Sequence, residues 1–334
     1  MKVYKVGGAV RDRYMGIKPK DTDWVVVGSS PEEMIREGFK KVGKDFPVFL
    51  HPKTNEAYAL ARKEKKIGAG HKKFEFIFSP DVTLEEDLER RDLTINAMAL
   101  DEHGNLIDPF NGIKDIENKY FRPVSDAFFE DPLRALRVAR FKAQFPEFIL
   151  SESLEKALNK ISISNELSYL SSERVWGEVA KSIDHNFLEF LKIVKKYGLA
   201  KPWFDELSQI PEIYSETNVI KWCQVSQANE FNFARNLDIP KNYTKQLTLW
   251  KKFHSYNKSG DIDYKIEFFK DFSKNNLSDA VFTLKFFKNI NLECIPIIKE
   301  YANFNFGDLS SNERKNIEKI KDKELKAIIN KYGE

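Results

Sequence analysis

Cysteine is scarce in this chain of 334 residues, and the shortage limits the kinds of site it can build. Its two cysteines, Cys223 and Cys294, cannot form a disulfide framework, nor a zinc site by themselves. We expect both to be small buried hydrophobic residues. Long apolar runs are also missing, since no stretch approaches the roughly 20 consecutive apolar residues that cross a bilayer as a helix. A disulfide-stapled scaffold and a membrane-spanning protein are therefore both disfavoured.

The N-terminus, MKVYKVGG, alternates like a strand and lacks the long apolar segment of a signal peptide, so a cytoplasmic location is expected. A hydrophobic content of 42% is typical of a folded globular chain. The net charge of +3 neither demands nor excludes a nucleic-acid partner. Charge is unevenly spread, however, because residues 62–73 hold six Lys or Arg and one Glu. This segment predicts a basic loop, with a solvated hairpin tip as the alternative.

Glycine becomes rare after residue 126, and the pattern changes there from mixed to helical. Before that point, β-forming runs predict strands at 2–6, 24–27, 56–62 and 74–78. The same part predicts a helix at 30–38, with Ser30 as N-cap, Pro31 at the first helical position and two glutamates in the first turn. It also predicts a segment at 84–98 that begins as a helix. After it, helical spacing predicts helices at 131–145, 153–160, 171–183 and 187–197. These patterns indicate an α+β protein, with a mixed sheet and helices first and an all-helical remainder.

Two aspartates, Asp21 and Asp23, stand just before the strand-forming run of residues 24–27. Because residues i and i+2 of a strand point the same way, at a rise of about 3.3 Å per residue, their carboxylates should converge on one face. Two such charges repel each other unless cations balance them. Mg²⁺ ions held by the carboxylate oxygens would do so and would drive phosphoryl transfer. A turn with a cap is the plainer alternative.

Gly7 and Gly8 follow directly on the first predicted strand. Glycine lets the backbone approach a phosphate closely, with amide groups facing the anion. Residues 9–12 then begin a helix, whose N-terminus also favours phosphate. A tight strand-to-helix turn is the simpler interpretation. Together with the carboxylate pair, however, this turn is an arrangement suited to nucleotidyl transfer from a triphosphate.

The segment GGAVRD…DTDWVVVG, within residues 7–28, resembles the signature of class II template-independent nucleotidyltransferases of the DNA polymerase beta superfamily. This family contains CCA-adding enzymes and bacterial poly(A) polymerases. Four further segments resemble its other motifs in order and spacing: RRDLTINAMA at 90–99, DPFNG at 108–112, EDPLRALRVARF at 130–141 and SSERVWGE at 171–178. The sequence at 45–52 and 58–66 is similar to that of bacterial CCA-adding enzymes rather than to that of poly(A) polymerases.

The resemblance implies a Mg²⁺-dependent enzyme that builds or repairs the 3′-terminal CCA of tRNA from CTP and ATP. It also implies a catalytic head at residues 1–125, a helical neck with a base-templating helix at 126–197, and a body and tail for tRNA binding at 198–334. The alternatives are a partial enzyme that adds only CC or only A, a poly(A) polymerase, and a non-catalytic tRNA-binding protein. The basic loop at 62–73 favours complete CCA addition.

The family motifs also assign residue roles, beginning with Asp21 and Asp23 as metal ligands. Asp131 and Arg134 would read the base, because a carboxylate only accepts and a guanidinium only donates, a pair that suits cytosine and adenine and rejects guanine and uracil. They stand at i and i+3 of the predicted helix, hence on one face, and an ordinary ion pair is the alternative. Asp92 would accept from a ribose hydroxyl. The full set of expected nucleotide-binding residues is Gly8, Arg11, Arg91, Asp92, Asn96, Asp131, Arg134, Arg137 and Arg140.

One departure from some longer relatives concerns the HD phosphohydrolase domain, whose metal site needs a His-Asp pair. None of the five histidines here is followed by Asp, so that activity is not expected. A third metal-binding carboxylate is not assigned, with Glu56 and Glu64 as candidates. Beyond residue 200, aromatic residues and Lys interleave, which either phosphate contacts or ordinary core helices would explain.

Overall fold

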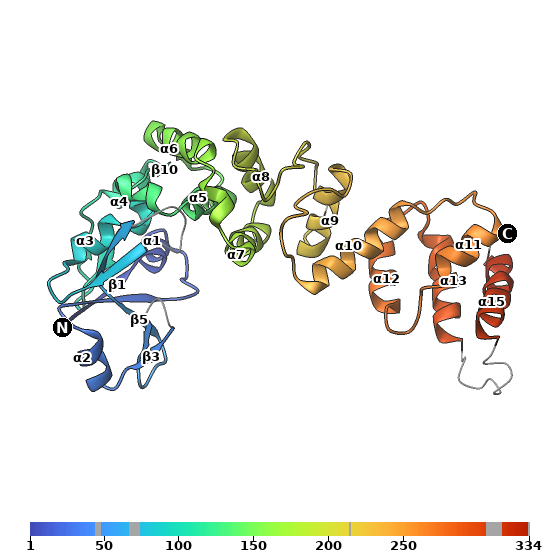
Figure 1. Ribbon diagram of the computed structural model, residues 1–334, viewed down its shortest axis with the longest axis horizontal. Coiled ribbons are helices and arrows are strands. Elements are labelled where there is room, and N and C mark those ends of the chain that lie inside the picture. The colour runs from blue at the N-terminus through green and yellow to red at the C-terminus, as the bar shows by residue number, and fades with distance from the viewer. Residues whose placement is uncertain (44–47, 67–73, 214, 305–315, 333–334) are drawn as a thin grey trace. The chain divides into compact units, whose positions relative to one another are not determined.

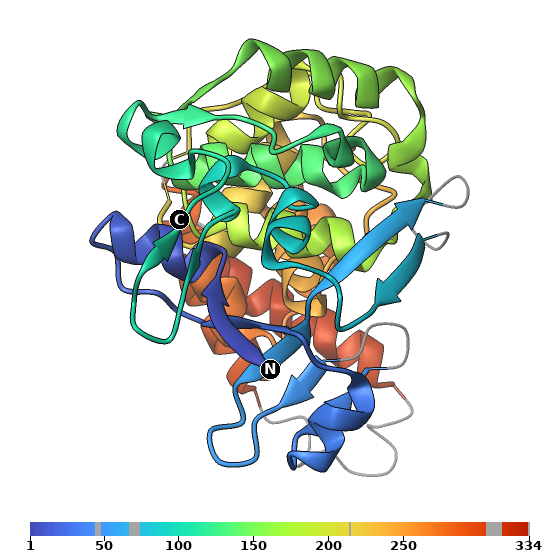
Figure 2. The same cartoon turned by 90° about the vertical axis from the view of Figure 1, so that its left-hand side faces the viewer.

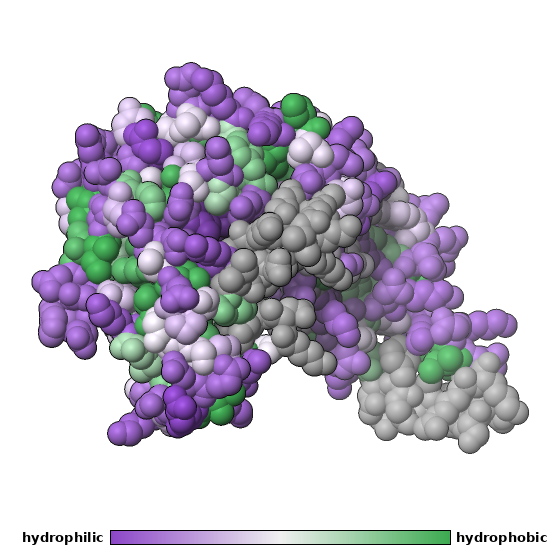
Figure 3. All heavy atoms as spheres, turned by 60° about the vertical axis from the view of Figure 1, so that its left-hand side comes forward, coloured by the Kyte–Doolittle hydropathy of each residue, from purple (hydrophilic) through white to green (hydrophobic). Residues whose placement is uncertain are grey.

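The computed structural model describes residues 1–43, 48–66, 74–213, 215–304 and 316–332. The chain divides into two compact units, the first formed by residues 1–210 and 233–238 and the second by residues 211–232 and 239–334. Within the described ranges, no helix is long and apolar enough to cross a membrane. On the face drawn in Figure 3, hydrophilic side chains predominate and hydrophobic ones form small separate patches.

The first unit contains a seven-stranded mixed sheet in the order β3-β4-β5-β2-β1-β8-β9 (Figure 1). Neighbouring strands are antiparallel except β2 and β5, which run parallel. Two smaller sheets pair β6 with β7 and β10 with β11. The strands are β1 Lys2–Val6, β2 Asp23–Val27, β3 Lys40–Val42, β4 Val48–Leu50, β5 Ala57–Leu60, β6 Arg62–Lys66, β7 Phe74–Phe78, β8 Ala99–Leu100, β9 Leu106–Ile107, β10 Tyr120–Phe121 and β11 Ile149–Leu150.

Strand β2 is apolar on both faces because both faces are covered. Val25 packs into a cluster with Leu88, from the helix that follows β7. Val26 packs on the opposite face, in a cluster with Met34 from the helix that follows β2. Successive strand residues point to opposite faces, so an uninterrupted apolar run is expected in a strand that helices cover on each side.

The described part of the first unit contains eight α-helices. Ser30 and Thr83 begin α2 and α3, each with a capping box, which confirms the N-cap predicted at Ser30. The helices are α1 Gly8–Tyr14, α2 Pro31–Arg36, α3 Leu84–Glu89, α4 Gly112–Glu117, α5 Leu133–Gln144, α6 Glu152–Ile163, α7 Ser172–Ile183 and α8 Phe187–Lys196. Figures 1 and 2 show α5–α8, in green, to one side of the blue strands.

Two predicted elements of the first unit differ in extent. The strand predicted at 56–62 is two strands, β5 and β6, which part at Ala61. The helix that begins at Leu84 ends at Glu89, because Leu93 pairs with Pro123 and the amide of Thr94 donates to the carbonyl of Arg122. A 3₁₀ helix, η1 Thr94–Asn96, follows; two others are η2 Asp126–Glu130 and η3 Glu166–Tyr169.

The second unit is helical in the part described, as predicted for this end of the chain. The part predicted to be all helical from residue 126 is not entirely so, because β11 lies within it. Its helices are α9 Asn218–Ala228, α10 Lys241–His254, α11 Ile262–Phe269, α12 Leu277–Leu284, α13 Asn291–Asn303 and α15 Ile317–Tyr332. Cys223 and Cys294 are both fully buried among its apolar side chains, as predicted. Burial raises the pKa of each thiol to about 12, so neither is a reactive thiolate at neutral pH.

Candidate active site

The pairing of β1 with β2 brings the glycine turn and the aspartates to one end of the sheet. Val6, the last residue of β1, pairs with Asp23, the first of β2. Gly7 then turns the chain into α1 with a φ of +72°, which residues with a β-carbon rarely adopt. A β-carbon on Gly7 would also lie 2.9 Å from Nη1 of Arg91. Glycine is therefore required here both by the backbone and by the close arginine.

A pocket of about 810 Å³ opens at this end of the sheet, within the first unit. Its lining includes all eleven residues that the sequence motifs nominated: Gly8, Arg11, Asp21, Asp23, Arg91, Asp92, Asn96, Asp131, Arg134, Arg137 and Arg140. Eleven Lys and Arg side chains line it against six Asp. This excess of positive charge favours an anionic ligand such as a polyphosphate.

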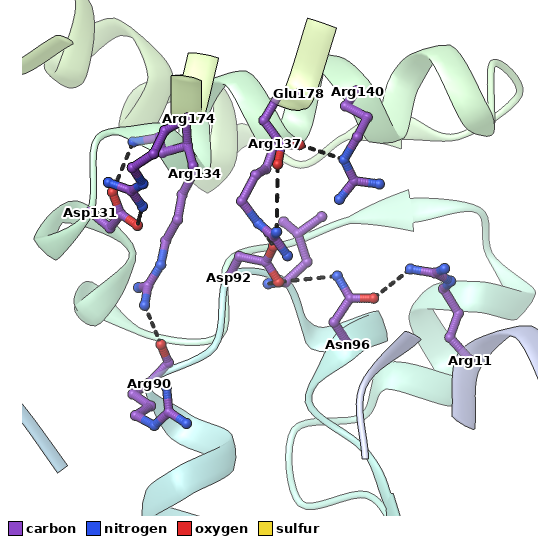
Figure 4. Close-up of polar contacts among 12 residues, drawn as sticks. Arg11, Arg90, Asp92, Asn96, Asp131, Arg134, Arg137, Arg140, Arg174 and Glu178 are labelled. Carbon is purple, nitrogen blue, oxygen red and sulfur yellow. Dashed lines mark hydrogen bonds and ion pairs between the residues drawn. The ribbon is translucent and has the colours of Figure 1, made fainter. Parts of the chain in front are cut away.

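A chain of hydrogen bonds joins α5 to α1 through the segment after α3 (Figure 4). Nε of Arg137 donates to Oδ2 of Asp92 over 2.8 Å, and Nδ2 of Asn96 donates to Oδ1 of Asp92 over 3.0 Å. Oδ1 of Asn96 in turn accepts from Nη1 of Arg11 over 2.6 Å. Arg11 is only 4% exposed and also pairs with Asp12. These side chains are therefore held in fixed positions along one wall of the pocket.

Asp92 stays ionised although only 5% of it is exposed. Burial acts to raise the pKa of Asp92, but the charge of Arg137 and the hydrogen bond from Asn96 outweigh it and hold that pKa well below its usual range. Each carboxylate oxygen has two acceptor positions, and Arg137 occupies one on Oδ2. The predicted acceptance of a ribose hydroxyl is therefore compatible with the contacts Asp92 makes.

Arg90 and Arg91 are anchored by a carboxylate that the sequence did not single out. Asp87, at the end of α3, is fully buried and accepts from both guanidinium groups, at 2.6 Å from Arg90 and 3.2 Å from Arg91. Burial raises the pKa of Asp87, but the two arginines lower it further, so the net shift is downward. Asp87 thus fixes the position of Arg91 beside the glycine turn.

The predicted helical pairing of Asp131 with Arg134 is wrong in one respect. Helix α5 begins at Leu133, with Pro132 as its N-cap, and Asp131 is extended at φ −118° and ψ 106°. The residue before a proline is disfavoured in the helical region, which explains the late start. Oδ1 of Asp131 instead accepts from the amide of Leu133, the first residue of the helix, over 3.1 Å. Both residues still line the pocket, but not as members of one helix face.

Two side chains of α7, Arg174 in the pocket lining and the buried Glu178 behind it, hold residues of this wall, and neither was nominated from the sequence. Nη2 of Arg174 donates to Oδ2 of Asp131 over 2.7 Å. Oε2 of Glu178 accepts from Nε of Arg140 over 2.5 Å, and Oε1 lies 3.9 Å from Nη1 of Arg137. The motif SSERVWGE contains both residues, and their i, i+4 spacing places them on one helix face. That spacing was the available signal.

The guanidinium of Arg134 is held by backbone carbonyls. Nη2 donates to the carbonyl of Arg90 over 2.5 Å, and Nη1 donates to the carbonyl of Ala127. Arg134 therefore connects the start of α5 to the end of α3. Its side chain is positioned at the pocket wall rather than left to rotate in solvent.

Asp21 and Asp23 are exposed, and neither carboxylate makes a hydrogen bond or ion pair with another described residue. Asp21 precedes β2, so the two carboxylates share the pocket without both being strand residues. In the described ranges, no group of three or more His, Cys, Asp or Glu is arranged as a metal site. Mg²⁺, however, often binds through one or two carboxylates together with substrate phosphates and water. Two unpaired carboxylates in a phosphate-attracting pocket fit that mode.

Part of the predicted basic loop lies outside the described residues, namely 67–73. Its flanking strands β6 and β7 form an antiparallel pair from Arg62 with Phe78 to Lys66 with Phe74. Arg62 at the base of this hairpin lines the pocket. Of the two candidate third carboxylates, Glu56 accepts from Thr54 and does not line the pocket, and the side chain of Glu64 lies outside the described part.

Residues 3–122 match the family of the Poly A polymerase head domain. The Multifunctional CCA protein of Pseudoalteromonas atlantica is 52% identical over 225 residues, which cover 66% of this chain and 55% of that protein. Its namesake from Aromatoleum aromaticum is 57% identical over 183 residues, covering 55% of this chain and 45% of that protein. The chain thus spans about half the length of the curated relatives it matches.

Solved structures show the fold over the whole chain. The Bacillus stearothermophilus CCA-adding enzyme in complex with CTP superposes with a TM-score of 0.64 at 22% identity, covering 98% of this chain and 88% of that one. The Thermotoga maritima CCA-adding enzyme complexed with tRNA superposes with a TM-score of 0.61 at 20% identity, covering 99% of this chain and 90% of that one. These matches confirm the α+β fold that the sequence predicted. Residues 3–122 therefore match the Poly A polymerase head domain family, and the chain has the fold of the CCA-adding enzymes.

Proposed function

We propose that this chain is a tRNA nucleotidyltransferase that adds or repairs the 3′-terminal CCA from CTP and ATP without a nucleic-acid template. One observation carries the proposal: a single cationic pocket is lined by the glycine turn, the unpaired Asp21 and Asp23, and the pair Asp131 and Arg134. Relatives named Multifunctional CCA protein, at 50–57% identity, support the same function.

In this proposal the protein side chains bind and orient the two substrates. Backbone amides at Gly7 and Gly8, with Arg91 beside them, receive the triphosphate. Asp92 accepts from the ribose hydroxyl, and its bonds to Arg137 and Asn96 keep it ionised and fixed for that task.

Base choice rests on Asp131 and Arg134. Cytosine and adenine share an amine donor beside a ring-nitrogen acceptor, which an acceptor-only carboxylate and a donor-only guanidinium complement. Guanine and uracil reverse that pattern and would leave buried polar groups unpaired, and each bidentate contact discriminates by about 1–3 kcal/mol.

The tRNA 3′-hydroxyl attacks the α-phosphorus of the nucleotide, a phosphoester bond forms, and pyrophosphate leaves. Two Mg²⁺ ions held by Asp21 and Asp23 would supply the charge that lowers the pKa of the hydroxyl and stabilises the leaving group. The same proposal includes domain boundaries at 125/126 and 197/198, with tRNA bound by residues 198–334. It also includes a cytoplasmic location, where tRNA and nucleotides occur.

Single-nucleotide incorporation tests the function. The purified protein with Mg²⁺ is given tRNAs that end at the discriminator base, at C or at CC, with CTP, ATP, UTP or GTP singly and together. We expect two C and then one A, with the reaction stopping there. A stop at CC, or addition only of A to CC ends, would indicate a partial enzyme. Long A tails on any RNA 3′ end would indicate a poly(A) polymerase, and binding without incorporation a non-catalytic protein.

A further inference from the structure

The pocket extends along α5 one turn beyond Arg140, the last residue that the motifs assign to the incoming nucleotide. Its lining follows one side of the helix in steps of three or four residues, from Arg134 through Arg137 and Arg140 to Gln144. Ten residues of α-helix span roughly 15 Å. Stacked nucleotides repeat at about 3.4 Å, so this wall is about four nucleotides long and one nucleotide does not fill it.

Helix α7 runs beside α5 in the same direction, and its pocket-facing residues advance with those of α5. Arg174 contacts Asp131 before the start of α5, and Glu178 contacts Arg140 in its third turn. One turn further on, Lys181 lines the pocket near the level of Gln144, and the amide of Asn186 donates to the carbonyl of Ala143. Asp184 and His185 also line this end.

Unused hydrogen-bond donors gather at this end of the pocket. The side chain of Lys181 is exposed and makes no hydrogen bond or ion pair with any other described residue. Nε of Arg140 is held by Glu178, whereas its Nη1 and Nη2 have no hydrogen-bond partner in the described part of the chain. Figure 4 shows those two nitrogens pointing away from Glu178. Gln144 adds an amide that can both donate and accept.

We propose that Arg140, which the motifs assign to the incoming nucleotide, instead binds the unpaired 3′-terminal strand of the tRNA, the nucleotides that precede the reacting 3′-hydroxyl. Gln144 and Lys181 bind the same strand. The inference rests on the proposed function, because it names where the second substrate of that reaction lies. Cationic groups that follow a phosphate backbone, with a side-chain amide for 2′-hydroxyls or base edges, are the usual means of holding single-stranded RNA. The length of the wall places this strand next to the incoming nucleotide.

The first test compares Lys181→Ala and Gln144→Ala with Lys156→Ala in the full chain. Lys156 is an exposed lysine of α6 that does not line the pocket. We expect Lys181→Ala to raise KM for tRNA by about 3- to 10-fold and to lower the salt slope of tRNA binding by about 0.7, the contribution of one single-strand phosphate contact. KM for CTP should change by less than about twofold, and Lys156→Ala should change neither constant.

A second measurement locates the contact on the RNA. A neutral methylphosphonate replaces each of the last phosphates of the tRNA in turn, and binding is measured without nucleotide. One replacement should weaken binding to the wild-type protein several-fold and leave binding to Lys181→Ala unchanged, because the contact is already lost there.

Two outcomes would overturn the inference: equal effects of Lys181→Ala and Lys156→Ala on tRNA binding, or a rise in KM for CTP instead of tRNA. Failure of the wild-type protein to extend any tRNA would instead count against the proposed function. The methylphosphonate measurement needs no turnover, so the two failures remain distinguishable.

Discussion

Nη2 of Arg174 lies 2.7 Å from Oδ2 of Asp131, and this contact joins the first turn of α7 to the residue that precedes α5. Both side chains are about three-quarters buried, with 24% and 22% exposed. Asp131, the proposed base-reading carboxylate, therefore accepts from the amide of Leu133 with one oxygen and from Arg174 of a different helix with the other. Its orientation depends on α7.

Replacement of Arg174 by Ala should therefore impair base selection more than folding. Removing the cation frees Asp131 to rotate, so we expect weaker discrimination of CTP and ATP against UTP and GTP. The loss of stability should stay near 1 kcal/mol, because the ion pair is partly exposed. Misincorporation assays and thermal melting of the variant test this, with Arg174→Lys as the charge-preserving control. Unchanged selectivity in Arg174→Ala would contradict the positioning role.

Replacement of Asp21 or Asp23 by Ala should abolish nucleotide incorporation without unfolding the protein. Both carboxylates are exposed and have no partner among the described residues, so stability should change by no more than about 0.5 kcal/mol. Incorporation on tRNA ending in CC, together with the melting temperature, gives both readouts. Asn variants at the same positions remove charge but keep size. An active Asp21→Ala protein would refute the metal-ligand assignment.

The ion pair between Asp92 and Arg137 should make stability depend on acid pH. Because the folded-state pKa of Asp92 is lowered, its contribution is complete above the unfolded value of about 4 and is lost as pH falls toward the folded value. At pH 7 we expect Asp92→Asn to cost about 3 kcal/mol, as for one broken buried pair. The difference from wild type should shrink below pH 4 in urea unfolding. Asp126→Asn, at an exposed carboxylate, is the control, and a pH-independent difference would contradict the linkage.

Two glycines should respond to alanine in opposite directions. A β-carbon on Gly112 would lie 2.4 Å from the carbonyl oxygen of Thr94, so Gly112→Ala should cost about 1–3 kcal/mol and displace the segment that carries Asn96. A β-carbon on Gly177, inside α7, meets nothing within 4 Å among the described atoms. Gly177→Ala should therefore stabilise the protein by up to about 1 kcal/mol. We expect the melting temperature to fall in Gly112→Ala and to rise in Gly177→Ala. Equal shifts in the two variants would contradict both predictions.

Several elements could be read from the sequence because their causes are local. The strand at residues 2–6 and the capped start of α2 at Ser30 were predicted with the bounds or the cap that the structure shows. The start of α5 is also encoded locally, because Pro132 disfavours a helical Asp131. The apolar spacing around it nevertheless predicts a helix from residue 131, two residues too early. The five family motifs are likewise short segments that can be recognised locally. The α+β fold was predicted from strand and helix patterns, which are also local.

The sequence by itself determined which residue types stand at each motif and therefore which side chains could surround a nucleotide. Only the tertiary structure decided their partners, because those partners are far apart along the chain: Asp92 and Arg137 are 45 residues apart, and Asp131 and Arg174 are 43 apart. Helical periodicity and capping depend on neighbours within about four residues. The pairing of charges depends instead on how α5 packs against α7 and against the segment after α3, which no local pattern specifies.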